Sequence, residues 1–162
     1  MHPFALLQIM VLLALANGTP IIAKKMFARR LSRPFDAGLL FFDQRPLFGP
    51  SKTIRGVLSS IVVTTAGASV LGLQPEIGAL VACAAMAGDL FSSFVKRRLN
   101  LPPSSQAIGL DQVPESLFPL LLCRDTFSLS TEDIALGVGA FFVGELILSR
   151  VLYTLRLRDE PY

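Results

Sequence analysis

Long apolar stretches, separated by polar or basic segments, dominate the pattern of the chain. A helix needs about 20 mostly apolar residues to cross a bilayer, or about 17 at the short end. Four stretches approach or meet that length: 4–22, 57–73, 77–94 and 134–155. A fifth, 113–129, is weaker because Pro114 and Pro119 interrupt it. The pattern predicts an all-α integral membrane protein with about five transmembrane helices in a single membrane domain, residues 1–162.

Charge is distributed unevenly between the segments that join these stretches. These segments contain three basic clusters. The second follows the third apolar stretch at residues 96–98, and the third comprises Arg156 and Arg158. The connections at 74–76 and 130–133 contain no Lys or Arg. The first and largest cluster consists of Lys24, Lys25, Arg29, Arg30, Arg33, Arg45, Lys52 and Arg55.

Positive charge favours the cytoplasmic side of a membrane. Five spans, with the N-terminus outside and the C-terminus in the cytoplasm, place all three basic clusters on that side. The cytoplasmic loops are then 23–56 and 95–112. We expect the protein to be integral to the cytoplasmic membrane, and the 17% of charged residues leaves little sequence for a large soluble domain. A cleaved signal peptide ending near Ala16 is the competing interpretation, but no Lys or Arg precedes the first stretch.

The third stretch carries a polar stripe. At 100° per residue, Asp89, Ser92, Ser93 and Lys96 fall on one face of a helix, next to the basic cluster that ends it. An acid, hydroxyls and cations at the edge of hydrocarbon suit metal-bound phosphates on a lipid. A simpler alternative is that Asp89 forms a salt bridge with Lys96 at a helix end.

Polar features also mark the starts of other helices. Ser51 or Thr53 can cap the second helix, whose first turn, together with Lys52 and Arg55, would attract an anion. The alternative is a solvated positive flank that only fixes topology. The motif at 17–20, Asn-Gly-Thr-Pro, predicts either a tolerated kink or a stretch of helix that lines a site.

The segment 110–116 and the fifth stretch contain the remaining acids of interest. Asp111 just before the fourth helix is a cap, a metal ligand or both, and Glu115 suits the positive end of that helix dipole. Glu145 lies near the middle of the fifth stretch and must be neutral, paired or functional, because a charge there costs about 2.5–3.5 kcal/mol.

Taken together, these motifs resemble the CDP-archaeol synthase family, relatives of the phosphatidate cytidylyltransferases. The resemblance rests on Gly88-Asp89, Ser93-Phe94, residues 96–99 and Leu110-Asp111-Gln112, and on the Lys-Thr-Ile-Arg-Gly motif at 52–56. The motif at 17–20 is similar to the family's asparagine-proline motif in the first helix. The resemblance extends from the first span to the fourth.

The resemblance implies an enzyme, a nucleotidyltransferase that transfers a cytidylyl group from CTP to a membrane lipid phosphate and releases pyrophosphate. It implies Mg²⁺ as the cofactor, with Asp89 and Asp111 as metal ligands and, with Lys96, as catalytic residues. The expected partners are CTP, a lipid phosphate and the membrane, with no nucleic acid, and a homodimer stays open. Arg98 is expected to face lipid headgroups and not to bind substrate. The expected substrate-binding residues are Asn17, Lys52, Arg55, Ser92, Ser93, Arg97 and Gln112.

The chain departs from the family at two places. Residues 48–51 replace an acidic pair that archaeal members carry before the lysine motif, and residues 113–115 replace a leucine-aspartate pair. A bacterial branch that acts on a diacyl lipid phosphate is therefore as reasonable as an archaeal ether-lipid enzyme. The non-enzymatic alternative is a lipid-binding or transport subunit for anionic lipids. A phosphatidyltransferase is disfavoured because its aspartate-rich signature is missing.

Overall fold

The protein is all-helical, as predicted. The structure, a computed structural model, describes residues 3–27 and 32–155, so Arg29, Arg30, Arg156 and Arg158 of the basic clusters lie outside it. In the described residues, β structure is limited to two isolated bridges within the loop 32–53 and its junction with the second helix. The five helices are α1 (Pro3–Phe27), α2 (Ile54–Val70), α3 (Pro75–Arg98), α4 (Gln112–Leu122) and α5 (Thr131–Thr154).

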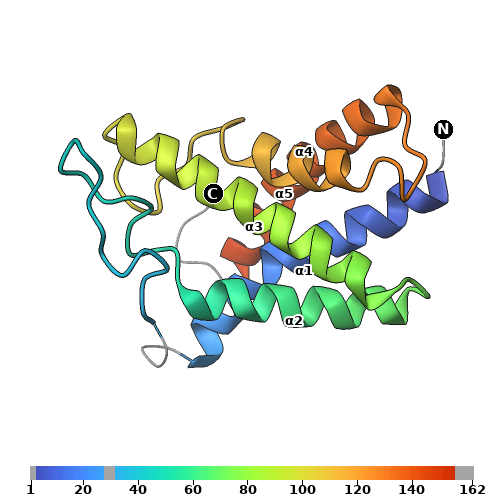
Figure 1. The fold of residues 1–162 in the computed structure, drawn as a ribbon, viewed down its shortest axis with the longest axis horizontal. Coiled ribbons are helices and arrows are strands. Elements are labelled where there is room, and N and C mark those ends of the chain that lie inside the picture. The colour runs from blue at the N-terminus through green and yellow to red at the C-terminus, as the bar shows by residue number, and fades with distance from the viewer. Residues whose placement is uncertain (1–2, 28–31, 156–162) are drawn as a thin grey trace.

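The helices run alternately up and down (Figure 1). The loop 32–53, the end of α3 and the loop 99–111 lie together at one end of the molecule. The α2–α3 and α4–α5 connections lie at the other end, with the start of α1. Two of the three basic clusters therefore contribute described residues to the same end, as the positive-inside pattern predicts.

Three of the described helices, α1, α3 and α5, are long and apolar enough to cross a membrane. Helix α2, with 17 residues, is at the lower limit for a span. Many of its apolar side chains are exposed, for example Val62 at 66% and Val70 at 87%, which suits contact with lipid chains.

Helix α4 is shorter than the sequence pattern predicts. It ends at Leu122 instead of continuing to residue 129, and a turn with Ser128 at φ 51° leads into α5. Eleven residues extend about 16 Å, roughly half of the hydrocarbon thickness. Leu129 lies beyond the helix but still packs in the core, whereas Arg124 and Asp125 between them are exposed.

Helix α3 is the central helix of the bundle. Half of its apolar window is buried, against 22% for the windows of α1 and α5. Small residues permit this packing: a Cβ on Gly78 would lie 2.6 Å from the backbone oxygen of Thr64 in α2, and one on Gly88 would clash with the backbone oxygen of Pro114 in α4. Glycine at these positions lets the backbones of neighbouring helices come close.

Helix α1 passes through Pro20 without a break. Proline has no N–H to donate to the carbonyl of Ala16, and the hydroxyl of Ser60 in α2 donates to that oxygen instead, at 2.8 Å. Ile9, Leu12 and Leu13 of α1 are fully buried in the core. The Asn-Gly-Thr-Pro motif therefore joins α1 to α2 and does not interrupt the helix.

Candidate active site

Asp89 of α3 forms an ion pair with Lys52, at the junction of the loop 32–53 and α2. Lys52 Nζ donates to Asp89 Oδ1 at 2.5 Å, and the two side chains keep 23% and 20% of their accessible surface, so a ligand can reach them. The sequence alternative that paired Asp89 with Lys96 is wrong, because Lys52 takes that place.

Local structure holds Lys52 in position. Thr53 caps α2, as predicted, by accepting a hydrogen bond from the Gly56 N–H at 3.2 Å. Phe35 N donates to the Lys52 carbonyl at 2.7 Å. Burial lowers the pKa of Lys52, but the attraction of Asp89 and other nearby carboxylates raises it by more, so this amine stays cationic.

A second ion pair joins Lys96 of α3 to Asp111, just before α4. Lys96 Nζ lies 2.6 Å from Asp111 Oδ1 and donates to the Ser105 carbonyl at 3.0 Å. Asp111 Oδ2 accepts from Ala107 N at 2.8 Å. Asp111 stands at the N-cap position of α4 but makes no capping hydrogen bond, because the ion pair and this loop contact use its carboxylate.

Glu115 lies beside the Lys52–Asp89 pair, whereas its position in the sequence indicated only a place at the positive end of a helix dipole. It is 6% exposed, and its carboxyl group interacts with that of Asp89. Lys52 interacts electrostatically with Asp89, Glu115 and Asp111 together. The available signal was its spacing: Glu115 follows Asp111 by four residues and so lies on the same helix face.

We call this group the acid–lysine cluster: Lys52, Asp89, Lys96, Asp111 and Glu115. Asp89 lies about 13 Å along α3 from the helix end at Arg98, so the cluster lies below the end of the span. Short helix α4 can begin there because Gly88 has no side chain to block its first turn. Glu145 of α5, whose role the sequence left open, interacts electrostatically with Glu115.

Arg97 and Arg98 brace the loops around the cluster. Arg97 is 4% exposed and donates to the Pro102 carbonyl at 2.8 Å, while its Nη1 lies against Gly49. Arg98 donates to the Pro46 carbonyl at 2.7 Å and pairs with Asp43 at 3.1 Å. The expectation that Arg98 faces lipid headgroups is therefore wrong, because protein groups surround its guanidinium.

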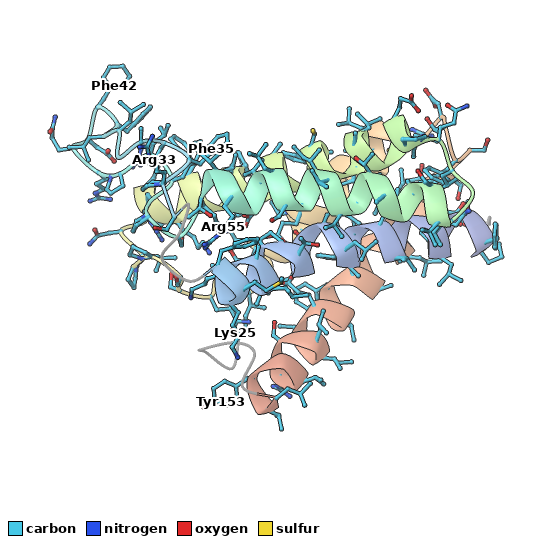
Figure 2. The ribbon with its side chains drawn as sticks, turned by 90° about the horizontal axis from the view of Figure 1, so that it is seen from below. Lys25, Arg33, Phe35, Phe42, Arg55 and Tyr153 are labelled. Atoms are coloured by element: carbon cyan, nitrogen blue, oxygen red, sulfur yellow. The ribbon has the colours of Figure 1, made fainter. Side chains whose placement is uncertain are left out.

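The other predicted substrate residues have different placements. Ser92 donates to the Leu110 carbonyl at 2.6 Å, and Gln112 Oε1 accepts from Gly109 N at 2.8 Å, so both shape the segment that carries Asp111. Ser93 is 2% exposed beside them on α3. Asn17 donates to Leu13 within α1. Arg55 lies at the beginning of α2 (Figure 2).

The chemistry of the cluster fits a hard divalent cation. Magnesium prefers oxygen ligands and is usually held by one or two carboxylates, with water and substrate phosphates completing its coordination. Among the described residues no group of three or more His, Cys, Asp or Glu side chains is arranged to hold a metal. The adjacent carboxyl groups of Asp89 and Glu115, with Asp111 nearby, supply the one or two carboxylates that such an ion needs.

Comparison with known proteins identifies the family. A family model described as CarS-like, CDP-archaeol synthase, matches residues 5–162. CDP-archaeol synthase of Pyrobaculum calidifontis is 34% identical over 160 residues, which cover 91% of this chain and 90% of the relative. That of Pyrobaculum islandicum is 31% identical over 156 residues, with 91% of each chain covered.

A solved structure has the same fold. It is described as an intramembrane enzyme for archaeal membrane lipids biosynthesis, and it superposes with a TM-score of 0.76 at 28% identity. The superposition covers 87% of this chain and 90% of the solved one. The chain thus belongs to the CDP-archaeol synthase family, and its fold is that of an intramembrane enzyme.

Proposed function

We propose that this membrane enzyme transfers a cytidylyl group from CTP to a lipid phosphate at the acid–lysine cluster, giving a CDP-lipid and pyrophosphate. The observation that carries the proposal is the convergence of three carboxylates and two lysines below the end of α3. Carboxylates that suit a divalent cation and amines that suit phosphate are therefore adjacent, within an apolar bundle where a lipid can reach them.

The reaction needs little acid–base chemistry. A phosphate monoester has a second pKa of about 6, so the lipid phosphate is already a dianionic nucleophile near pH 7. Its oxygen attacks the α-phosphorus of CTP, a P–O bond forms there, and the bond between that phosphorus and the β-phosphate oxygen breaks. Pyrophosphate leaves with the electron pair, and no side chain has to remove a proton.

The residues of the cluster therefore act by position and charge. Lys52 and Lys96 neutralise the triphosphate and the lipid phosphate as these approach each other, and Asp89, with Glu115 or Asp111 as a second carboxylate, would hold Mg²⁺. Bound there, the ion would offset the negative charge that develops on the leaving pyrophosphate. Arg97 and Ser92 hold the surrounding loops in register, so the predicted phosphate contact of Arg97 becomes a supporting role.

The lipid is an archaeal ether-lipid phosphate in this proposal. The named relatives are CDP-archaeol synthases, and the solved structure is described as an enzyme for archaeal membrane lipids. We further propose that the cluster opens toward the cytoplasm, where CTP is made, because described cations of two basic clusters lie at that end of the bundle.

One assay tests the reaction and its lipid together. Purified protein is incubated with radiolabelled CTP and either an archaeal ether-lipid phosphate or phosphatidate, with and without Mg²⁺. We expect labelled CDP-lipid and pyrophosphate, only with the metal, and more product from the ether lipid. A stronger reaction with phosphatidate would contradict the lipid assignment alone.

Matched substitutions test the site. Asp89→Asn and Asp111→Asn should each abolish most product formation, while Glu76→Gln, an exposed acid in the first turn of α3, should leave it unchanged. If both aspartate variants keep full activity, the cluster is not the active site. Lipid binding that needs neither CTP nor Mg²⁺, with no CDP-lipid formed, would favour a binding subunit instead.

A further inference from the structure

The loop 32–53 carries exposed apolar side chains at its outer end. Leu39 is 62% exposed, Leu40 57% and Phe42 94%, and we call these three residues the apolar tip. Figure 2 shows Phe42 at the outer corner of the molecule, beyond Arg33 and Phe35. A group of large exposed apolar side chains marks a surface that contacts lipid or another molecule.

Hydrogen bonds hold the backbone of the tip in a compact turn. Phe41 N donates to the Arg45 carbonyl at 2.8 Å, Leu47 N to the Leu39 carbonyl at 2.9 Å, and Gln44 N to the Phe41 carbonyl at 2.9 Å. The backbone can therefore not fold back to bury Phe42 without losing these bonds. The hydrogen-bonded turn therefore keeps the Phe42 side chain exposed.

The tip is attached to the last turn of α3. The guanidinium of Arg98 lies 4.8 Å from the ring centre of Phe41 and 4.9 Å from that of Phe94, and the two rings meet edge-on at 5.2 Å. Arg45 Nη1 donates to the Arg98 carbonyl at 2.6 Å. Phe94 belongs to the apolar span and Arg98 ends it, so the tip is tied to the membrane boundary, where aromatic side chains gather.

The charges around the tip also suit a membrane surface. Asp43 follows Phe42, but its carboxylate pairs with Arg98 at 3.1 Å and with Arg45 at 4.0 Å. This acid is thus matched by two cations, and Arg33 adds exposed positive charge near the tip. Anionic headgroups attract an exposed cation such as Arg33 near the surface.

We propose that the apolar tip inserts into the interfacial layer of the surrounding bilayer, with anionic lipids as its ligand. Leu39, Leu40 and Phe42 enter the layer between headgroups and acyl chains. The loop 32–53 is then anchored at two places, on α3 through Arg98 and in lipid through the tip, and it carries Lys52 between that anchor and α2.

The chain contains no tryptophan, so one substitution creates a single fluorescent reporter. Phe42→Trp protein is reconstituted in vesicles of phosphatidylcholine and phosphatidylglycerol that contain lipids brominated either near the glycerol or near the acyl-chain end. We expect emission at short wavelength, quenched more by the shallow bromines than by the deep ones. Val62→Trp, exposed on the middle of α2, is the reference and should be quenched more by the deep bromines.

Leu39→Trp is a second reporter, which should give the same shallow profile. Replacing phosphatidylglycerol with phosphatidylcholine should reduce the shallow quenching at both positions. Long-wavelength emission that acrylamide quenches and bromines do not would overturn the proposal, because the tip would then lie in water. Short-wavelength emission that no bromolipid quenches would also overturn it, since protein, for example a second copy of the chain, would cover the tip.

Discussion

Glu115 changes what the acid–lysine cluster can do at the level of single residues. It is buried beside Asp89, and the two carboxyl groups repel each other when both are ionised unless a cation lies beside them. Lys52 supplies one positive charge, and a divalent ion would supply more. Glu115 should therefore contribute to metal binding as well as to structure.

Replacing Glu115 with Gln removes the ionisable carboxyl group and keeps the shape of the side chain. We expect activity at limiting Mg²⁺ to fall by about 10- to 100-fold, with part of the loss recovered at high Mg²⁺. The measurement is the rate of CDP-lipid formation over a magnesium titration. Glu132→Gln, an acid in the first turn of α5 at the opposite end, is the control and should follow the wild-type curve. An unchanged magnesium requirement in Glu115→Gln would contradict a role in metal binding.

Asp36 shapes the loop that presents Lys52. Its carboxylate accepts hydrogen bonds from Phe48 N at 2.8 Å, Gly49 N at 3.0 Å and Gly38 N at 3.0 Å. Burial raises the pKa of Asp36, but these backbone donors lower it by more, so the pKa lies below its ordinary value. Because the folded pKa is the lower one, the ionised carboxylate stabilises the fold above about pH 4, and this contribution is lost as the pH falls through the folded pKa.

Asp36→Asn should therefore lower the free energy of unfolding by about 1–3 kcal/mol near neutral pH. Thermal unfolding in detergent from about pH 6 to pH 3 should show a flatter pH dependence for the variant than for the wild type. Asp125→Asn changes an exposed acid in the turn after α4 and should leave both the stability and its pH profile unchanged. Parallel profiles for wild type and Asp36→Asn would show that Asp36 does not stabilise the loop in this way.

At the level of elements, the contact between α3 and α4 assembles the site. Gly88 brings the first turn of α4 against α3, and thereby Glu115 against Asp89. The neighbouring atoms belong to the backbone of Pro114 and Glu115, which cannot rotate away as a side chain would. A methyl group at position 88 must therefore push the helices apart.

Gly88→Ala should lower the free energy of unfolding by about 1–3 kcal/mol and remove most of the activity. The matched control is Gly139→Ala in α5, where nothing lies within 4 Å of the added Cβ. There alanine should leave activity unchanged and raise helix stability by up to about 1 kcal/mol. Thermal unfolding in detergent and the CDP-lipid assay measure both effects. Equal behaviour of the two variants would contradict the close contact.

Sequence patterns predicted some helix ends better than others. The start of α2 was recognisable because Thr53 is a capping residue directly before an apolar helix, and the structure has this cap. The end of α4 was predicted too late, at residue 129, although Arg124 and Asp125 follow shortly after Leu122 and lie in a turn. Capping is a local property of the chain, whereas Phe127 and Leu129 extend the apparent apolar stretch because they pack in the core from beyond the helix.

At the level of the whole molecule, the up-and-down arrangement predicts which loops face each side of the membrane. The loop 99–111 lies at the basic end and the turn at Gln74 at the opposite end. Cysteines are introduced at Pro103 or Gln74 after the two free cysteines, Cys83 and Cys123, are replaced with alanine.

A membrane-impermeant maleimide should label Gln74→Cys in intact cells, and Pro103→Cys only after the membrane is opened, because basic loops stay in the cytoplasm. The extent of labelling on a gel measures the orientation. The reverse pattern would place the acid–lysine cluster outside the cytoplasm and would contradict the proposed access of CTP.

The sequence by itself determined the properties that depend on composition and local order. Long apolar stretches, the distribution of Lys and Arg, the cap at Thr53 and the spacing of Asp89 and Lys96 are all present in the linear chain. They predicted the five helices, the membrane class and the family.

Only the tertiary structure decided which charges meet. It paired Lys52 with Asp89 and Lys96 with Asp111, brought Glu115 into the cluster, and enclosed Arg98 between Phe41 and Phe94. These partners are far apart in the sequence, or several of them could pair with the same charged side chain. The spacing along the chain therefore does not show which pairs form. Two contacts determine which charged residues pair: the close approach of α3 and α4 at Gly88, and the packing of the loop 32–53 on the end of α3.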